Sequence, residues 1–342
     1  MKFKVILNVA TLVAIGLVLV FGWHDIEAAF RQMRQLDLWV LALFIPIQLF
    51  SFYAVAQVYA HFFRLTGTPI SMKTLLPAAI ELNFVNHIFP SGGVSGFSDL
   101  TIRLKRDGVS TAKSTLAQLV RYVLSFLTFI VLLVGAVLVL AIEDRASGFI
   151  IFVATVLTSV VVFSTMGLAF VIGSERRIKG FVSGLARVLN RIIHVVRRSH
   201  PETIGMAKLQ KTLQELHKDY LLLRKDFGKM KQAMVWALLG NIAEVALIYV
   251  TFMAHDMWVN PGAVIIAYAV ATIAGLLAIL PGGIGVYEPL MAAVLVSSGI
   301  PAGVALSVTL VSRVAGLLLA LSTGYVLYHI AIKRYARHRT ER

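Results

Sequence analysis

Six long apolar segments constrain this chain more than any other feature of its sequence. They run over residues 5–23, 38–60, 115–141, 149–172, 232–253 and 303–330. Each is long enough to cross a hydrocarbon core about 30 Å thick as an α-helix. The 342 residues are 58% hydrophobic and only 14% charged, a balance that excludes the soluble globular and the disordered classes. The sequence therefore predicts an all-α polytopic membrane protein with six full spans, the first of them retained rather than cleaved as a signal peptide.

Two further apolar segments, about 75–98 and 262–298, are interrupted in the middle by proline and glycine. The interrupting residues are Pro90, Gly92, Gly93 and Gly96 in the first segment, and Pro281, Gly282, Gly283 and Gly285 in the second. Proline removes a backbone donor and glycine tolerates non-helical dihedrals. Broken backbone at membrane depth persists only where protein or a polar cavity satisfies it. We therefore expect two re-entrant helix–turn–helix hairpins, with these residues forming their turns and hinges.

The basic residues predict how the chain is oriented. With both termini in the cytoplasm of a cell-membrane protein, 27 of the 32 Lys and Arg residues lie on the cytoplasmic side. Arg31, Arg34 and Arg145 lie on the opposite side of the membrane, and Arg121 and Arg313 lie within spans. Such a bias is the usual determinant of membrane topology. It requires the first hairpin to enter from the cytoplasm and the second from outside, and it accounts for the net charge of +15 without a nucleic-acid partner.

The two interrupted segments resemble each other. When Pro90 is aligned with Pro281, Gly108 and Gly299 both follow 18 residues later, and Arg121 and Arg313 follow after 31 and 32 residues. An intramembrane arginine is rare, so its recurrence argues against a chance match. Since the predicted orientations are opposite, we expect an inverted repeat, an architecture typical of transporters with a site at the repeat interface.

This repeat divides the chain into three parts: a first membrane half over 1–172, a cytoplasmic insert over 173–231, and a second membrane half over 232–342. Residues 176–198 interleave basic and apolar side chains at helical spacing, which predicts a helix lying on an anionic leaflet. Leucines and aromatic residues over 209–227 form a seam for packing on another helix. Two helices packed beneath the membrane domain are the plainer interpretation; lipid regulation or partner binding is the alternative.

Ionisable side chains inside the membrane are candidate functional residues because burying them is costly. A guanidinium presents paired donors that suit a phosphate, so Arg121 and Arg313 are candidates for holding an anionic head group. The alternative is that each arginine pairs with a carboxylate, for example Arg313 with Glu288. The remaining candidates for substrate binding are polar or acidic: Glu81, Asn86, Asp99, Asn241, Glu244 and Glu288.

Glu288 has a second interpretation, as a first-turn carboxylate that accepts hydrogen bonds from free amides at a helix start.

No hydrolase, metalloprotease or nucleotide-binding motif occurs in the sequence. The chain has no cysteine, which excludes disulfides, thiolate metal sites and a cysteine nucleophile. We therefore expect no catalytic residue, no bound metal, no cofactor and no enzymatic activity.

The stretches PSGGVSG (90–96), DGVS (107–110) and LPGGIGVYE (280–288), the last followed by Arg313, resemble a known family. It is the lysylphosphatidylglycerol synthase transmembrane-region family, the flippase-like domain of the multiple peptide resistance factor. The resemblance covers about 5–330. It implies a stand-alone lipid translocase without the soluble synthase domain of the bifunctional members.

Three functional hypotheses follow. The first is a flippase that moves a phospholipid or polyprenyl-phosphate-type lipid, with an anionic phosphate head group, through a polar cavity between the repeats. The second is a membrane-embedded enzyme of lipid-linked sugar or phospholipid metabolism. The third is a membrane assembly subunit that binds a partner. A homo-oligomer or a lipid-modifying enzyme is the partner that we expect.

Overall fold

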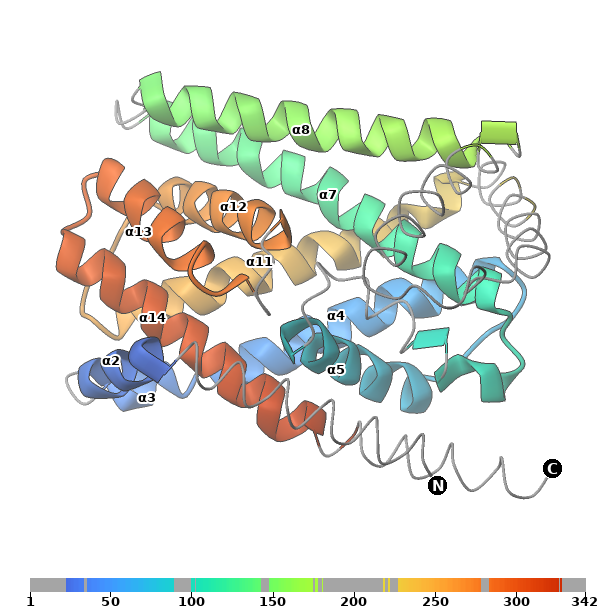
Figure 1. Ribbon diagram of the computed structural model, residues 1–342, viewed down its shortest axis with the longest axis horizontal. Helices are drawn as coiled ribbons and strands as arrows, with labels where there is room; N and C mark the ends of the chain where they lie inside the picture. Colours follow the sequence, from blue (N-terminus) through green and yellow to red (C-terminus); the bar gives the residue numbers. More distant parts are fainter. Residues whose placement is uncertain are drawn as a thin grey trace, which may run out of the picture.

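A computed structural model describes the chain over residues 23–33, 36–88, 100–101, 103–142, 148–174, 176–177, 180, 218, 221, 227–277, 283–325 and 327. Every regular element in these ranges is a helix (Figure 1). The elements are α2 (Trp23–Met33), α3 (Leu38–Leu41), α4 (Phe44–Leu65), α5 (Met72–Ile88), η1 (Lys105–Asp107), α7 (Thr111–Ile142), α8 (Gly148–Ile172), η2 (Phe227–Met230), α11 (Lys231–Met253), α12 (Pro261–Leu277), α13 (Tyr287–Ser297), α14 (Ala302–Leu319) and the π-helical η4 (Ala320–Gly324).

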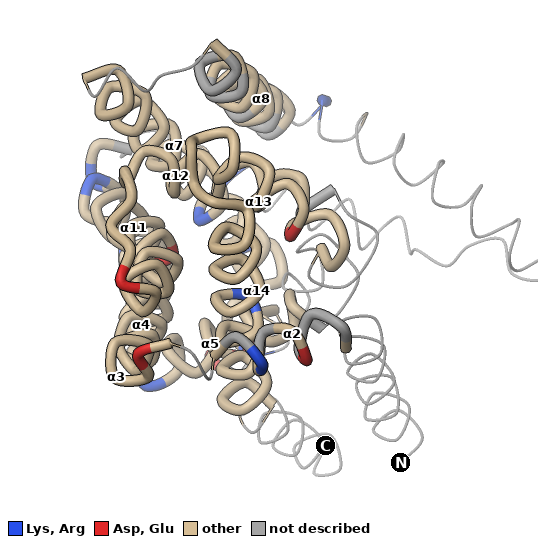
Figure 2. The backbone as a smooth tube through the Cα atoms, turned by 90° about the vertical axis from the view of Figure 1, so that its left-hand side faces the viewer, with Lys and Arg blue, Asp and Glu red and all other residues tan. Residues whose placement is uncertain are grey.

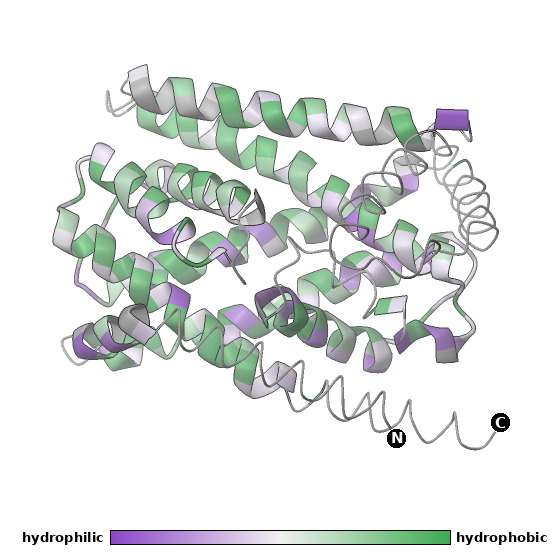
Figure 3. Cartoon of the chain, in the orientation of Figure 1, coloured by the Kyte–Doolittle hydropathy of each residue, from purple (hydrophilic) through white to green (hydrophobic). Residues whose placement is uncertain are grey.

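Four helical stretches in the described ranges are long and apolar enough to cross a membrane. They are Leu38–Leu65, Thr111–Ile142, Gly228–Met253 and Ala302–Gly324, and they coincide with four of the six predicted spans. The fifth predicted span is the 25-residue helix α8, and the first lies outside the described residues except for Trp23. Apolar residues cover most of these helices (Figure 3), and few charged positions interrupt them (Figure 2). The all-helical membrane class is therefore confirmed, while the count of six spans stays a prediction.

The helices pack around a central pair formed by α4 and α11. α7 lies against α11 and α12, while α5 lies against α4 and against η4 at the end of α14. α8 covers α7 at one side of the molecule and α2 covers α14 at the other (Figure 1). Each half of the sequence therefore packs one of its shorter helices, α5 or α12, against a long helix of the other half.

The segment between α4 and α7 begins and ends at one end of the bundle. Lys113 Nζ donates a hydrogen bond to the carbonyl oxygen of Thr66 over 3.1 Å. Leu100 and Leu104 are fully buried in one apolar cluster with Phe63. The chain between these points includes α5 and the predicted turn, of which residues 89–99 lie outside the described part.

The turns at Gly108 and Gly299 have the same backbone geometry. Both glycines adopt a left-handed conformation, with φ of +74° and +86°. The next amide bonds back to the carbonyl five residues earlier, Val109 to Leu104 and Ile300 to Leu295, over 3.2 Å in each case. This is the Schellman arrangement, which also closes α4 at Gly67. α7 and α14 each begin three residues after the glycine, so the alignment made from the sequence superimposes two equivalent turns.

Gly324 permits the close contact between η4 and α5. A Cβ atom at this position would lie 2.2 Å from the Cβ atom of Phe84, a distance that real side chains do not adopt. We expect Gly324→Ala to force the two helices apart and to destabilise the protein by about 1–3 kcal/mol, measured as a lower thermal unfolding temperature in detergent. The control is Gly135→Ala on α7, where nothing lies within 4 Å of the added atom. Equal unfolding temperatures for the two variants would contradict this packing.

Candidate functional site

A cavity of about 260 Å³ lies between α4, α5, α7, α11 and α12. It brings together four of the residues singled out from the sequence, Asn86, Arg121, Asn241 and Glu244. These residues are spread over more than 150 positions of the chain, so only the packing of α5, α7 and α11 makes them neighbours. The further polar residues of the lining are Ser51, Asn83, His87, Tyr122, Ser125, Tyr268 and Thr272.

Arg121 is the cationic side chain of this cavity within the described lining. Its Nε and Nη1 atoms are buried without a hydrogen-bond partner among the described residues, while the guanidinium also interacts with the Tyr59 hydroxyl. The guanidinium carbon lies 5.2 Å from the centre of the Tyr122 ring, a cation–π distance. A guanidinium is always charged in a protein and has no acceptor, so donors left without partners face the cost of burial. The arrangement suits an anionic guest that accepts these hydrogen bonds.

Glu244 and Asn241 lie one turn apart on α11 and line the same cavity. Ser51 Oγ on α4 donates a hydrogen bond of 2.5 Å to Glu244 Oε1. Asn241 Nδ2 donates to the Ser125 carbonyl and to Thr128 Oγ1, both over 2.9 Å. Glu244 thus ties α11 to α4, while Asn241 ties it to α7. The cavity wall is fixed on two sides by the residues that supply its polar character.

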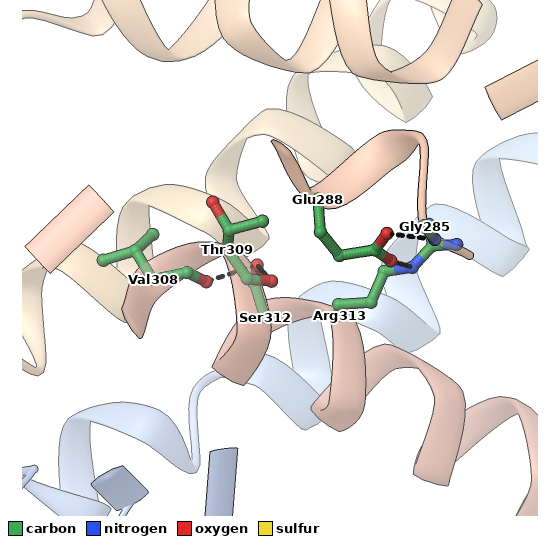
Figure 4. A network of polar contacts seen from close by, with 6 residues as sticks. All are labelled: Gly285, Glu288, Val308, Thr309, Ser312 and Arg313. Atoms are coloured by element: carbon green, nitrogen blue, oxygen red, sulfur yellow. Dashed lines mark hydrogen bonds and ion pairs between the residues drawn. The ribbon is translucent and has the colours of Figure 1, made fainter. Parts of the chain in front are cut away.

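Arg313 has a different environment from Arg121. Its Nε atom lies 3.0 Å from Glu288 Oε1 in an ion pair between α14 and the first turn of α13 (Figure 4). The other carboxylate oxygen accepts a hydrogen bond of 2.8 Å from the Gly285 amide. The Tyr287 ring lies 4.3 Å from the guanidinium carbon. Glu288 therefore fulfils both alternatives that the sequence left open. It pairs with Arg313, and it accepts a hydrogen bond from a backbone amide near the start of a helix. Neither residue lines the cavity of Arg121.

Glu81 lies outside that cavity. It is 1% exposed and forms an ion pair with Arg103. The distribution of basic residues in the sequence predicts Arg103 to be a cytoplasmic loop charge, whereas its side chain is only 18% exposed and reaches a carboxylate of α5. A charge count along a sequence does not separate a solvated loop arginine from a buried one. The signal that could have pointed to such a partner is Glu81 itself, because a carboxylate within an apolar segment needs a nearby cation.

The described hinge glycines lie at the start of α13. Gly283 has φ of +75°, and a Cβ atom there would lie 2.8 Å from the Cα atom of Gly275 on α12. Gly285 has φ of +82° and presents its amide to Glu288. At position 283 only glycine can adopt this left-handed backbone conformation and also approach Gly275 this closely. The other predicted hinge residues and one site residue lie outside the described part: Pro90, Gly92, Gly93, Gly96, Asp99, Pro281 and Gly282.

The insert over 173–231 lies almost wholly outside the described residues. Arg177 is an exception: its Nη1 atom donates to the Phe170 carbonyl over 2.7 Å, and its guanidinium carbon lies 3.8 Å from the centre of the Phe170 ring. This arginine folds back onto the last turns of α8, as cationic side chains do at a boundary between apolar and polar surroundings.

A second, apolar hollow of about 350 Å³ lies on α7, α11 and α12. These three helices also wall the polar cavity. On α7 and α12 the apolar hollow lies about one turn from the cavity lining, at Leu132 beside Phe129 and at Ile265 beside Tyr268. Its remaining lining residues are Ile242, Val245, Ala246, Tyr249, Val250, Met253 and Pro261. The hydroxyl of Tyr249 donates to the Val259 carbonyl over 2.8 Å, so the hollow offers a hydrocarbon surface beside the polar cavity.

Comparison with known proteins agrees with the resemblance seen in the sequence. Residues 5–324 match the family described as the lysylphosphatidylglycerol synthase TM region. A UPF0104 membrane protein of Pyrococcus horikoshii is 21% identical over 322 residues, which are 92% of this chain and 95% of the relative. A UPF0104 membrane protein of Methanothermobacter thermautotrophicus is 32% identical over 101 residues, 30% of each chain. The match over nearly the whole chain shows that this protein belongs to the lysylphosphatidylglycerol synthase transmembrane-region family.

Proposed function

We propose that this protein is a lipid translocase, which moves a lipid with an anionic phosphate head group between the leaflets of the cell membrane without changing it chemically. The head group occupies the cavity of Arg121, and at least one hydrocarbon chain occupies the apolar hollow beside it. Both termini lie in the cytoplasm. Family membership supports a role in membrane lipid metabolism, and the cavity supports the finer assignment.

The observation that carries the proposal is the adjacency of two unlike sites on the same three helices. A cavity with an arginine whose Nε and Nη1 donors lack partners attracts a phosphate. The hollow beside it has an apolar lining and attracts hydrocarbon. A small soluble anion needs only the first site and a hydrocarbon only the second. A phospholipid or a polyprenyl phosphate needs both at once.

The packing also supports an alternating-access mechanism built from two inverted halves. α12 of the second half lies against α7 of the first, and α5 of the first half lies against the end of α14 of the second. Equivalent turns at Gly108 and Gly299 precede the two arginine-bearing helices. In an inverted repeat, rocking of one half against the other opens a central site to each side in turn. The left-handed glycines Gly283 and Gly285 are suited to act as hinges in that motion.

Lipid translocation by the purified full-length protein tests this function. Vesicles carry tail-labelled fluorescent phosphatidylglycerol in both leaflets, and an impermeant reductant bleaches the outer leaflet. We expect vesicles with the protein to lose more fluorescence than the outer-leaflet fraction, because label from the inner leaflet becomes accessible. Mass spectrometry of the recovered lipid should show it unchanged. Failure to move phosphatidylglycerol, other phospholipids or a polyprenyl phosphate would reject the function, and an altered lipid would favour the enzyme hypothesis.

The apolar hollow gives a separate prediction. An Ala246→Trp substitution places an indole in the hollow, so it should compete with the hydrocarbon chain. We expect translocation of a long-chain phosphatidylglycerol to slow by about tenfold, equivalent to about 1.4 kcal/mol. The matched control is Val131→Trp on α7, where the native side chain is 59% exposed. Equal rates for the two variants would show that the chain crosses without using the hollow.

A further inference from the structure

The polar cavity holds opposite charges in equal number within its described lining. Arg121 supplies the positive charge and Glu244 the negative one, and His87 lines the same cavity. No ion pair within 4.0 Å joins Arg121 to a carboxylate among the described residues. Glu244 is nevertheless the acidic side chain that shares this lining with Arg121. The described lining of the cavity is thus close to neutral, which limits the cost of burying each charge.

The groups that face Glu244 come from every helix packed around it. α4 contributes the Ser51 hydroxyl, bonded to its Oε1 atom, and Gln48. α7 contributes Arg121, and α12 and α13 contribute the neutral phenols Tyr268 and Tyr287.

Two further basic side chains lie on the neighbouring helices α5 and α14. On α5, His87 lines the same cavity, with its Nδ1 atom 2.9 Å from the Asn83 carbonyl. On α14, Arg313 is held by Glu288. Within the described residues, Arg121 is therefore the cation that balances Glu244.

An anionic head group removes that balance. When its phosphate accepts hydrogen bonds from the Arg121 Nε and Nη1 atoms, the guanidinium is neutralised by the guest. Arg121, Glu244 and the phosphate together then carry one net negative charge in low-dielectric surroundings, where uncompensated charge is costly. A proton taken from water onto the Glu244 carboxylate restores neutrality. The Ser51 hydroxyl supports both states, because it donates to a carboxylate and can turn to accept from a carboxylic acid.

The other buried carboxylates in the described part of the chain, Glu81 and Glu288, are less suited to this role. Glu288 is paired with Arg313 and Glu81 with Arg103, and none of these four residues lines the cavity. An anion bound on Arg121 leaves both pairs intact. A head group bound in the cavity therefore affects the charge balance of Glu244, while Glu81 and Glu288 stay in their ion pairs.

Resting on the proposed function, we propose that Glu244 takes up one proton with each anionic head group bound on Arg121, so that the protein carries lipid and proton together. The proton comes from water on the side to which the cavity is open. It returns to water from the Glu244 oxygen when the head group leaves on the opposite side. The proton gradient thereby becomes an energy source and sets the direction of net lipid movement. A zwitterionic head group, which brings its own cation, takes up no proton at this site.

Calorimetry on the purified full-length protein counts this proton. The probe is short-chain phosphatidylglycerol, titrated at one pH in two buffers with different ionisation enthalpies. Its phosphodiester does not titrate near neutral pH, so proton uptake reports on the protein. We expect about one proton per lipid, and an affinity that falls about tenfold per pH unit where free Glu244 is ionised. Glu244→Gln should bind the lipid with no proton uptake and a flat pH profile. The exposed Glu27→Gln variant and short-chain phosphatidylcholine are the controls.

Each other outcome overturns the inference in a recognisable way. Wild-type binding without proton uptake rejects proton coupling while leaving the translocase function intact. Uptake that persists in Glu244→Gln but disappears in His87→Gln assigns the proton to α5 instead. Absence of phosphatidylglycerol binding, together with failure of the translocation assay, rejects the proposed function itself. The wild-type measurement needs no variant to fold and decides whether a proton is taken up, and the Glu244→Gln and His87→Gln variants decide which residue takes it.

Discussion

Replacing Arg121 with glutamine should slow lipid translocation by about thirtyfold or more. Truncating one partner of a buried charged contact costs about 2–5 kcal/mol, and about 1.4 kcal/mol is a factor of ten. Glutamine keeps a donor and much of the length but loses the charge and the forked geometry that a phosphate accepts. The measurement is the reductant-accessible fraction of fluorescent phosphatidylglycerol in vesicles reconstituted with equal amounts of each protein.

Two further variants separate charge from geometry. Arg121→Lys retains the cation as a point charge without the fork, so its rate should lie between those of the wild type and Arg121→Gln. Arg64→Gln removes an exposed arginine at the end of α4 and should leave the rate unchanged. If Arg121→Gln moves lipid as fast as Arg64→Gln does, head-group binding at Arg121 is wrong.

Replacing Arg313 with glutamine should chiefly destabilise the protein. The Glu288 carboxylate would remain buried with only the Gly285 amide as its described partner. An uncompensated buried charge of this kind costs about 3–5 kcal/mol. The expected result is a lower thermal unfolding temperature in detergent. The double variant Glu288→Gln/Arg313→Gln should recover most of the loss, because it removes both charges together and keeps groups that form hydrogen bonds.

The exposed pair Glu27–Arg31 on α2 is the matched control, since its removal should cost no more than about 1 kcal/mol. A different outcome would change the role assigned to Arg313. If Arg313→Gln unfolds at the wild-type temperature yet translocates no lipid, then Arg313 contacts the substrate during transport, and pairing with Glu288 is only its resting state.

The sequence predicts much of this fold because a bilayer allows few solutions. Hydrocarbon leaves no partner for backbone groups, so a long apolar segment in a membrane must be helical. For this reason four predicted spans coincide with α4, α7, α11 and α14. The local sequence also indicates two equivalent turns. Gly108 and Gly299, aligned from sequence alone, both adopt the left-handed conformation.

The partners of the polar residues are less accessible from the sequence. Arg103 and Arg64 are both arginines between apolar segments, yet Arg103 reaches buried Glu81 while Arg64 is exposed. Ser51 carries no motif, but it bonds a carboxylate 193 residues away. Such contacts depend on how the helices cross one another. The spacing of residues along a single helix carries no information about that crossing.

The sequence by itself determined that the chain is helical and apolar and that it carries two arginines at matching positions of similar segments. Only the tertiary structure distinguished those arginines. The first turn of α13 brings Glu288 within 3.0 Å of Arg313, whereas the crossing of α4, α5, α7, α11 and α12 encloses Arg121 in a cavity where Nε and Nη1 lack described partners. The physical reason is that a buried charge must be compensated in three dimensions, and a residue's neighbours in space are set by packing, not by the local sequence.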